Sequence, residues 1–340
     1  MKSYYEGKKI LVTGGVGSIG SQLVRKLTSL EPEIIRVFDN NETGLFDFEQ
    51  SLNSEKVRFL LGDIRDKDRL VMAMDDIDIV FHTSALKHVP LCEFNPFDAV
   101  KTNVLGTQNV LEAALINEVE KVINVSTDKA VNPTNVMGAT KLLAERLTIS
   151  ANHYKGQKRT VFSSVRFGNV LNSRGSVIPL FKKQIQSGGP VTITDKNMTR
   201  FFMDIPTAVN LILEAGKLAS GREVFILKMP ALKILDLAEV MIQDLAGIYG
   251  HNPKKIKIQH IGVRSGEKLF EELMTESESF RAFESDEMYI IMPDTLPFEE
   301  PLHFHMTEQF HESVISNFSS NNTRLITKKE ISALVQTFES

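Results

Sequence analysis

A glycine-rich turn between a buried strand and a helix constrains the fold of this chain more than any other feature. Residues 14–20 (GGVGSIG) follow an apolar run at 10–13, and apolar side chains then recur at helical spacing at Ile19, Leu23, Leu27 and Leu30. Glycines allow a tight turn and a close backbone approach to phosphate, and the start of a helix supplies N–H donors. We therefore predict that a dinucleotide pyrophosphate binds at Gly14, Gly17, Ser18, Ile19 and Gly20.

Short apolar runs alternate with helix-period segments along the first half of the chain. Beyond residues 10–13, the sequence predicts buried strands at 34–38, 57–61, 77–81, 122–125 and 161–165. This alternation indicates an α/β fold with a Rossmann-like, doubly wound parallel sheet. Ligands of such sheets lie at the carboxyl ends of the strands.

The strand-helix pattern loosens after residue 167, where prolines and glycines interrupt it. We predict a dinucleotide-binding domain over 1–167, to which later segments return, and a smaller substrate-binding lobe mainly over 168–294. The tail at 295–340 contains a capping box at 327–330 (TKKE), which predicts a final helix. This tail is also a candidate latch between copies of the chain.

Asp39 ends the second predicted strand, 19 residues after the last glycine of the turn. A carboxylate there accepts hydrogen bonds from an adenosine ribose and repels a 2′-phosphate. The expected cofactor is NAD or NADP, with NAD favoured, although Arg36 and Lys56 could soften that preference. Asp63 and Ile64 follow the third strand and would meet the adenine edge. The competing interpretation is a glycine turn without a ligand and an Asp39 that only caps a helix.

The composition excludes several classes of function. The net charge of −4 comes from 39 basic and 43 acidic residues dispersed along the chain, which argues against a nucleic-acid partner. The single cysteine, Cys92, rules out an intrachain disulfide framework and a cysteine-built zinc site, and the histidines lack metal-ligand spacing. No run of about 18 apolar residues occurs, so we expect no membrane span. The single cysteine fits a cytoplasmic protein, and the cysteine count and histidine spacing lead us to expect no metal.

Two short segments carry the pattern of a reaction site. Residues 126–130 (STDKA) precede residues 137–141 (MGATK), in which Met137 stands one helical turn before Lys141. A tyrosine at the methionine position would be a usable base beside the lysine, whereas a thioether cannot take a proton. Oxidation of a hydroxyl therefore needs another group, and Asp128 and Lys129 lie nearby. Taken alone, Met137 and Lys141 would more often be a core methionine and a solvated lysine.

With these residues in view, the chain resembles the extended short-chain dehydrogenase/reductases. Within them it is similar to the nucleotide-sugar 4,6-dehydratases of polysaccharide biosynthesis that act on UDP-N-acetylglucosamine. The resemblance runs from about residue 9 to 293, and its most specific segments are 82–90 (HTSALKHVP), 126–141, 166–170 (RFGNV) and 263–268 (VRSGEK). Methionine at 137 departs from most extended relatives but matches one subgroup of these dehydratases.

The resemblance implies an internal redox cycle on a sugar nucleotide. Hydride passes from C4 of the sugar to the cofactor, water leaves across C5 and C6, and the hydride returns to C6. Asp128 would then be the acid for the C6 hydroxyl and Lys129 the base for the C5 proton, Thr127 would bind O4, and Lys141 would hold the nicotinamide ribose. These roles need a raised pKa at Asp128 and a lowered pKa at Lys129. The group that deprotonates the C4 hydroxyl stays open between Asp128, Lys129, a relay through Thr127, and water.

Family position also implies the substrate contacts. The diphosphate and uridine would be bound by cations and polar groups from several motifs, namely Lys87, Asn169, Arg174, Ser176, Arg200, Arg264 and Glu267. Each arginine taken singly is more often a surface ion-pair residue.

Two other functions compete with the dehydratase. A UDP-hexose 4-epimerase uses the same fold and the same C4 oxidation, but it would keep the tyrosine and has no need of Asp128 and Lys129. A catalytically silent NAD(P)-binding regulator would have no reason to keep an acid, a base and a diphosphate site. Retention or inversion at C5 stays open. By resemblance to relatives that form dimers or rings, we expect a homo-oligomer.

Overall fold

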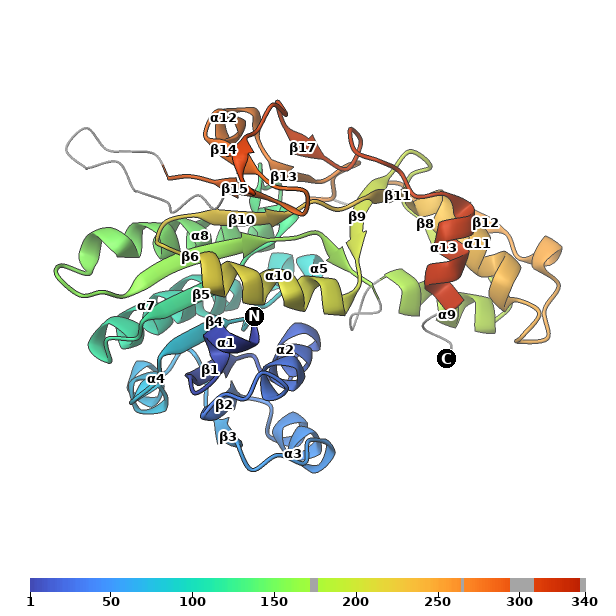
Figure 1. Cartoon of the computed structure of the whole chain (residues 1–340). Helices are drawn as coiled ribbons and strands as arrows, with labels where there is room; N and C mark the ends of the chain where they lie inside the picture. The colour runs from blue at the N-terminus through green and yellow to red at the C-terminus, as the bar shows by residue number, and fades with distance from the viewer. Residues whose placement is uncertain (172–176, 264–265, 294–308, 337–340) are drawn as a thin grey trace.

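A large, mainly parallel sheet organises the protein. The computed structural model describes residues 1–171, 177–263, 266–293 and 309–336. Ten strands form the sheet in the order β16-β14-β15-β10-β6-β5-β4-β1-β2-β3 (Figure 1). The strands from β10 to β3 are parallel: β1 (Lys9–Thr13), β2 (Ile34–Asp39), β3 (Val57–Leu61), β4 (Ile79–His82), β5 (Lys121–Val125), β6 (Val161–Arg166) and β10 (Val224–Leu227).

The predicted fold class is confirmed, and the predicted strands correspond to β1 to β6. The largest difference is in the fourth strand, which begins at Ile79 rather than at Ile77. Ile77 is buried in the turn after α4, where its backbone N–H donates to the Met74 carbonyl. The prediction started the strand two residues too early, because the residues of a buried turn are apolar as well.

Late segments of the chain extend the parallel sheet on one side. Three antiparallel strands continue it beyond β10, namely β15 (Met288–Ile291), β14 (Ala282–Glu284) and β16 (His311–Glu312). The edge of the sheet is therefore built by residues 282–291 and 311–312, which lie in the sequence between two elements of the smaller lobe, β12 (Ile258–His260) and α13 (Lys328–Gln336).

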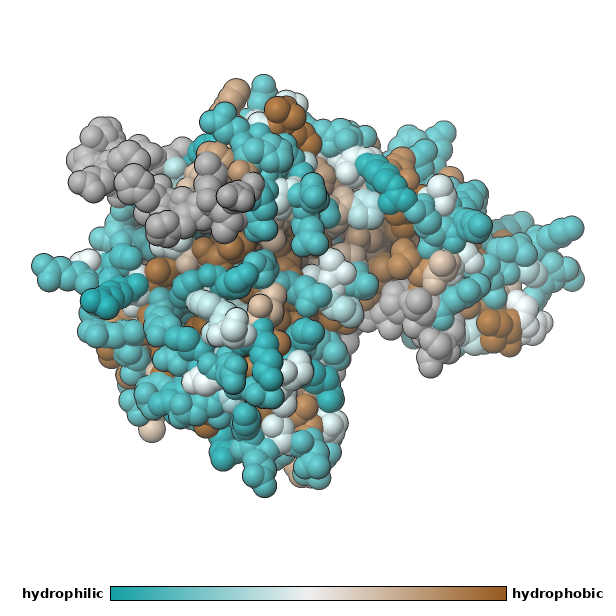
Figure 2. All heavy atoms as spheres, viewed as in Figure 1, coloured by the Kyte–Doolittle hydropathy of each residue, from teal (hydrophilic) through white to brown (hydrophobic). Residues whose placement is uncertain are grey.

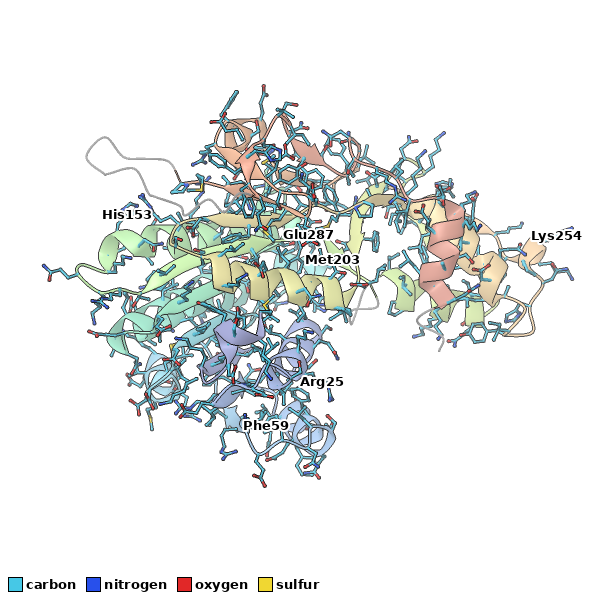
Figure 3. All side chains as sticks on the ribbon, in the orientation of Figure 1. Arg25, Phe59, His153, Met203, Lys254 and Glu287 are labelled. Atoms are coloured by element: carbon cyan, nitrogen blue, oxygen red, sulfur yellow. The ribbon has the colours of Figure 1, made fainter. Side chains whose placement is uncertain are left out.

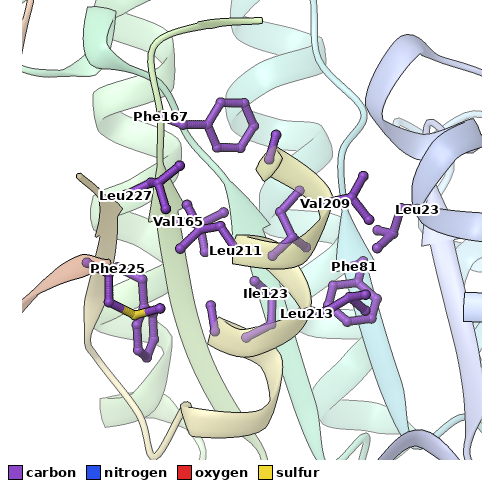
Figure 4. Close-up of a cluster of buried hydrophobic side chains, with 14 of the residues drawn as sticks. Leu23, Phe81, Ile123, Val165, Phe167, Val209, Leu211, Leu213, Phe225 and Leu227 are labelled. Carbon is purple, nitrogen blue, oxygen red and sulfur yellow. The ribbon is translucent and has the colours of Figure 1, made fainter. Parts of the chain in front are cut away.

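Helices cover both faces of the sheet, so its strands are buried on both sides. Ile10 and Val12 of β1 belong to one core and Leu11 to the other, as alternation along a strand requires. The first core includes α2 (Ser18–Thr28), α3 (Glu42–Ser51) and α10 (Ile205–Leu218); the second includes α4 (Lys67–Met74), α7 (Gly106–Ile116) and α8 (Val136–Tyr154). Figure 4 shows α10 side chains such as Val209 and Leu213 against Ile123 and Phe81 of the sheet.

A smaller lobe has its own apolar core. It contains α9 (Val177–Gln186), α11 (Ile234–Leu245), α13 (Lys328–Gln336), the pair β8 (Val191–Ile193) and β12 (Ile258–His260), and β9 (Thr199–Met203) between β11 (Ala231–Lys233) and β7 (Asn169–Val170). The predicted final helix is confirmed as α13: Glu330 accepts from the Thr327 N–H, and the Glu330 N–H donates to Thr327 Oγ1. In Figure 3, Lys254 marks the outer tip of this lobe and Arg25 the region of α2.

Short elements join these parts. They are α1 (Lys2–Tyr5), α5 (Val89–Phe94), α6 (Pro96–Ala99), a π-helical turn (Val100–Leu105), 3-10 turns at Asp128–Ala130 and Pro253–Lys255, α12 (Glu276–Ser279), and β13 (Glu272–Met274) paired with β17 (Phe318–Ser319). Hydrophilic side chains cover most of the face in Figure 2. No helix in the described ranges has the length and apolar character needed to cross a bilayer.

Candidate active site

A cavity of about 520 Å³ lies at the carboxyl ends of the parallel strands. Its walls come from the glycine-rich turn after β1, the segment after β4, the turn after β5, the first turns of α8 and the segment after β6. This is where a doubly wound sheet binds its ligands. The predicted pyrophosphate residues Gly14, Gly17, Ser18, Ile19 and Gly20 all line it.

The glycine-rich turn is packed too tightly for side chains at three of its positions, two of which, Gly14 and Gly20, face backbone atoms. Gly14 has φ +68°, and a Cβ there would lie 2.7 Å from the Ser84 backbone nitrogen. A Cβ on Gly20 would lie 2.2 Å from the Gly14 carbonyl oxygen. Helix α2 begins at Ser18, so the N-terminus of this helix lies beside the cavity. This cradle fits a dinucleotide pyrophosphate.

Asp39 and Asp63 lie at the ends of neighbouring strands. Asp39 Oδ2 accepts from the Val16 N–H at 3.2 Å and Oδ1 from the Asn41 N–H at 3.0 Å, so this carboxylate ties β2 to the glycine-rich turn. Asp39 does not cap α3, whose N-cap is Asn41. Hydrogen bonds from Arg65 lower the pKa of Asp63 to about 2. Ile64 is buried in the second core.

The predicted reaction residues Thr127, Asp128 and Lys129 share one tight turn after β5. Asp128 Oδ1 accepts from Thr127 Oγ1 at 2.8 Å and from Lys129 Nζ at 3.0 Å. The Asp128 N–H donates to the Phe167 carbonyl, which joins this turn to the segment after β6. Thr127 and Lys129 line the cavity, whereas Asp128 is completely buried behind them. Its Oδ2 has no hydrogen-bond partner among the described residues.

The charge environment of Lys129 is opposite to the one expected for a base. Burial would lower its pKa, but the negative charges of Asp128 and Glu271 outweigh burial, so the pKa of Lys129 is raised. Its Nζ also donates to Asn169 Oδ1 at 3.1 Å. The expected lowering of this pKa is therefore wrong for the arrangement seen here, because the sequence did not reveal the second carboxylate.

Met137 and Lys141 lie one turn apart at the start of α8, and both line the cavity. Asn135 caps this helix by accepting from the Gly138 N–H. Met137 packs with Cys92 and Ala99. Lys141 Nζ donates to the Val125 carbonyl at 2.7 Å, and burial lowers the pKa of Lys141 to about 8 against a smaller opposing effect of Glu145. The ammonium therefore lies at the cavity wall one helical turn from Met137, which takes the position where a tyrosine would otherwise be.

The expected substrate residues are only partly gathered at the cavity. Lys87 and Asn169 line it. Arg200 does not: its guanidinium is buried and donates to the carbonyls of Thr199 and Lys268, each at 2.7 Å. Glu267 lies near Arg200, with 4.0 Å between its Oε1 and Arg200 Nη2. Three further candidates, Arg174, Ser176 and Arg264, lie outside the described residues.

Glu271 is a charged neighbour of the site that the sequence reasoning missed. Its Oε1 lies 3.6 Å from Lys129 Nζ and 3.8 Å from Arg200 Nε, and its side chain is buried. A signal was available, because Glu271-Glu272 comes three residues after the 263–268 segment and opens a strand. Alternation along that strand turns one of two adjacent carboxylates inward.

A buried charge cluster holds the Glu271 segment against the sheet. Arg166 donates to both oxygens of Glu145, to both oxygens of Glu278, and to the Leu273 carbonyl at 3.1 Å. Burial opposes the ionised state of Glu278, but Arg166 lowers its pKa overall. These contacts fix β13 against β6 and α8.

No group of three or more histidine, cysteine, aspartate or glutamate side chains in the described part of the chain is arranged to hold a metal ion.

Relatives with known names resemble nearly the whole chain. A protein of Methanocaldococcus jannaschii, named an uncharacterized membrane protein, is 60% identical over 86% of this chain and 88% of its own length. An inverting UDP-N-acetylglucosamine 4,6-dehydratase of Campylobacter jejuni is 39% identical over 96% of this chain and 97% of its own length. A UDP-glucose 4-epimerase of Rickettsia bellii is 40% identical over 96% and 95%.

Coverage differs among the other relatives. The match to the capsular polysaccharide biosynthesis protein CapD of Staphylococcus aureus is 47% identical but spans only 46% of that protein. Among solved structures, Pen from Bacillus thuringiensis has a TM-score of 0.90 and 44% identity, covering 98% of both chains.

The family comparison covers most of the sheet, the cavity and most of the smaller lobe. A model described as polysaccharide biosynthesis protein matches residues 10–293. This range contains the glycine-rich turn, the Asp128 turn and the Glu271 segment. The chain therefore belongs to the polysaccharide biosynthesis protein family of the extended short-chain dehydrogenase/reductases.

Proposed function

We propose that this protein is a UDP-N-acetylglucosamine 4,6-dehydratase that works with bound NAD or NADP. The observation that carries the proposal is the single turn that presents Thr127 and Lys129 at the cavity, with Asp128 bonded to both. A 4,6-dehydratase needs an acid and a base beside the oxidised sugar. The relative of Campylobacter jejuni named for this activity supports the substrate.

The glycine cradle supports a nicotinamide dinucleotide as the cofactor. Such a cofactor, when bound, takes up and returns the hydride of the sugar. The packing around Gly14 and Gly20 leaves backbone, rather than side chains, facing the pyrophosphate. Asp39 at the end of β2 favours NAD over NADP, because its charge would repel a 2′-phosphate.

The contacts within the reaction turn suggest a route for the C4 hydroxyl proton. A sugar hydroxyl bound to Thr127 can pass its proton through the Thr127 Oγ1 to Asp128, which already accepts that hydrogen bond at 2.8 Å. Asp128 then carries the proton needed to release the C6 hydroxyl as water. The ammonium of Lys141 would stabilise negative charge at O4 during the oxidation.

Lys129 is proposed as the base for the C5 proton. Its Nζ is on the cavity side of Asp128, and Asn169 holds it toward the segment after β6. It takes a proton from C5 and later returns one, so its own protonation is unchanged over a full cycle. Asp128 takes one proton from O4 and gives one to the leaving hydroxyl, which balances the loss of water.

Proton NMR of purified protein with UDP-N-acetylglucosamine in deuterated water tests this function. We expect a new C6 methyl signal with deuterium at C5, and the ring couplings then distinguish retention from inversion. Bound nicotinamide cofactor without any methyl product would overturn the proposed substrate and reaction.

A UDP-hexose 4-epimerase is the second candidate, because one relative at 40% identity carries that name. An epimerase would interconvert C4 epimers and form no methyl group, so the same spectra separate the two activities. Formation of neither product would favour the silent NAD(P)-binding protein.

We also propose that the protein is a homo-oligomer. The helices from α5 to α6 expose large apolar side chains, with Phe94 84% and Phe97 80% exposed, and Leu105 and Leu143 add to them. Exposed apolar residues that gather on one surface are typical of contacts between proteins. Sedimentation analysis of the wild type and of Phe94→Glu/Phe97→Glu tests it: a wild-type monomer would contradict the proposal.

A further inference from the structure

Lys129 has one more carboxylate neighbour than an ordinary ion pair requires. Its Nζ lies 3.0 Å from Asp128 Oδ1 and 3.6 Å from Glu271 Oε1. Both carboxylates are buried, and each has one oxygen without a hydrogen-bond partner among the described residues, Asp128 Oδ2 and Glu271 Oε2. An unpaired buried carboxylate oxygen is costly, so this cluster is suited to taking up a proton.

The two carboxylates differ in how they are bonded. Asp128 Oδ1 accepts short hydrogen bonds from Thr127 and Lys129 and is tied to the cavity side of the cluster. Among the described residues, the Glu271 carboxylate has only the longer ion pairs to Lys129 and to Arg200 Nε, at 3.8 Å. Burial raises the pKa of Glu271 against the opposing charges of Lys129, Arg200 and Lys268, while Asp128 raises it further. Glu271 is therefore the carboxylate better suited to hold a proton.

We propose that Glu271 is a positioning residue that reversibly holds the proton which Lys129 must lose before it can act as a base. An N–H bond of the Lys129 ammonium breaks and an O–H bond forms on Glu271, which leaves both side chains neutral and an electron pair on Lys129 Nζ. Lys129 then removes the C5 proton. After C5 is reprotonated, the carboxyl proton returns to Lys129, and neither residue is changed by the cycle. The inference rests on the proposed dehydratase function.

The backbone around Glu271 is held well enough for this role. The Glu271 N–H donates to Ser320 Oγ at 3.0 Å, and the Ser320 N–H donates to the Glu271 carbonyl at 2.8 Å. The Leu273 carbonyl, two residues later, accepts from Arg166. The carboxylate therefore approaches Lys129 from a fixed strand, and a small side-chain movement brings the 3.6 Å pair to hydrogen-bond distance.

The test separates C4 oxidation from C5 exchange in the intact protein. Glu271→Gln keeps the side-chain size but cannot take up the proton. We expect C4 oxidation, followed as reduced nicotinamide in a single turnover, to stay within about threefold, while deuterium incorporation at C5 falls by at least about 100-fold. Glu272→Gln is the matched control, because Glu272 lies on the adjacent strand position and contacts the exposed Asn132 amide instead. It should retain wild-type rates.

A purely structural role for Glu271 predicts a different pattern. If Glu271 served only as a counter-ion of Arg200, its replacement would lower the melting temperature and reduce both steps together. That result would overturn the inference. Glu271→Asp adds a second comparison: it keeps an acid but shortens the side chain, so we expect C5 exchange in the order wild type, then Asp, then Gln. Equal or better exchange in Gln than in Asp would also overturn it.

If Glu271→Gln does not fold, the ratio of C5 exchange to C4 oxidation in Glu271→Asp decides: a selective loss of exchange supports the role, and an unchanged ratio contradicts it. A wild type that forms no methyl product would instead count against the proposed dehydratase, and this inference would fall with it.

Discussion

The two sides of the cavity are built in different ways. On the cofactor side, one continuous stretch from β1 to α2 supplies the turn, in which close backbone packing leaves no room for a Cβ at Gly14 and Gly20. On the reaction side, the Asp128-Lys129 pair, Arg200 and Glu271 come from three segments far apart in the sequence and meet as charged groups. The cofactor side depends on the absence of side chains at its glycines. The reaction side depends on which of its charged side chains carry a proton.

This difference teaches where substitutions should act. Backbone sites fail when a side chain intrudes, which affects folding and binding together. Charge clusters fail when one partner is removed, which leaves a buried charge unpaired and changes the chemistry more than the fold. Substitutions on the two sides should therefore separate turnover, cofactor affinity and stability.

The largest expected effect is on the reaction side, with Asp128→Asn. The amide cannot carry the proton between Thr127 and the leaving hydroxyl, so we expect turnover to fall about 10³-fold while nicotinamide cofactor stays bound. Product formation and bound-cofactor content measure the two effects. Asp66→Asn is the control, because Asp66 caps α4 by accepting from the Arg69 N–H, and asparagine caps equally well. Unchanged turnover in Asp128→Asn would remove Asp128 from the reaction.

On the cofactor side, Gly20→Ala should act through packing. Its Cβ would lie 2.2 Å from the Gly14 carbonyl oxygen, so the turn must move. We expect a loss of about 1–3 kcal/mol in the free energy of unfolding and weaker cofactor binding, measured by denaturant titration and calorimetry.

Gly247→Ala is the matched control for Gly20→Ala. A Cβ at Gly247 meets nothing within 4 Å. Its unfolding free energy should change by less than about 0.5 kcal/mol. Equal effects of the two substitutions would contradict the packing argument.

Lys141→Met should separate stability from activity. Burial holds the pKa of Lys141 near 8, below its ordinary value of 10.5, so the unfolded chain binds this proton more tightly. Below pH 8 the buried ammonium lowers the free energy of unfolding by its full amount. This destabilisation diminishes as pH rises from 8 to 10.5. We expect the variant to gain about 1–3 kcal/mol at pH 7, less at pH 10, while turnover falls. Denaturant unfolding at both pH values measures this, and a pH-independent difference would refute the cause.

The smallest expected effect is a change in cofactor preference from Asp39→Asn. Loss of the charge should weaken NAD binding by about threefold to tenfold and improve NADP binding relative to NAD, since the repulsion of a 2′-phosphate disappears. Dissociation constants for both cofactors measure it. A wild type that prefers NADP would show that Asp39 has only a structural role, through its hydrogen bonds with Val16 and Asn41.

Several features could be predicted because they are local. The strands β1 to β6 appear as apolar runs, the glycine-rich turn as a continuous pattern, and α13 as a capping box. The positions of Met137 and Lys141 on one wall also follow from helical spacing. The edge strand β16 is short and pairs with β14, which lies far from it in the sequence, so no local pattern indicates it.

The chemistry of the reaction side shows the limit of such reasoning. Arg200 was predicted to bind diphosphate from its motif, yet its guanidinium donates to backbone carbonyls and lies beside Glu271. Lys129 was expected to have a lowered pKa, yet two carboxylates raise it. Neither environment follows from the neighbouring residues, because long-range packing brings the partners together.

The sequence by itself determined the strands β1 to β6, the glycine cradle and the Thr127-Asp128-Lys129 turn, since each depends on residues close together in the chain. Only the tertiary structure decided the protonation of that turn. It brings Glu271 within 3.6 Å of Lys129 by fixing β13 through Arg166 and Ser320. The physical reason is that burial and charge act through space, so a pKa depends on neighbours in the fold rather than on neighbours in the chain.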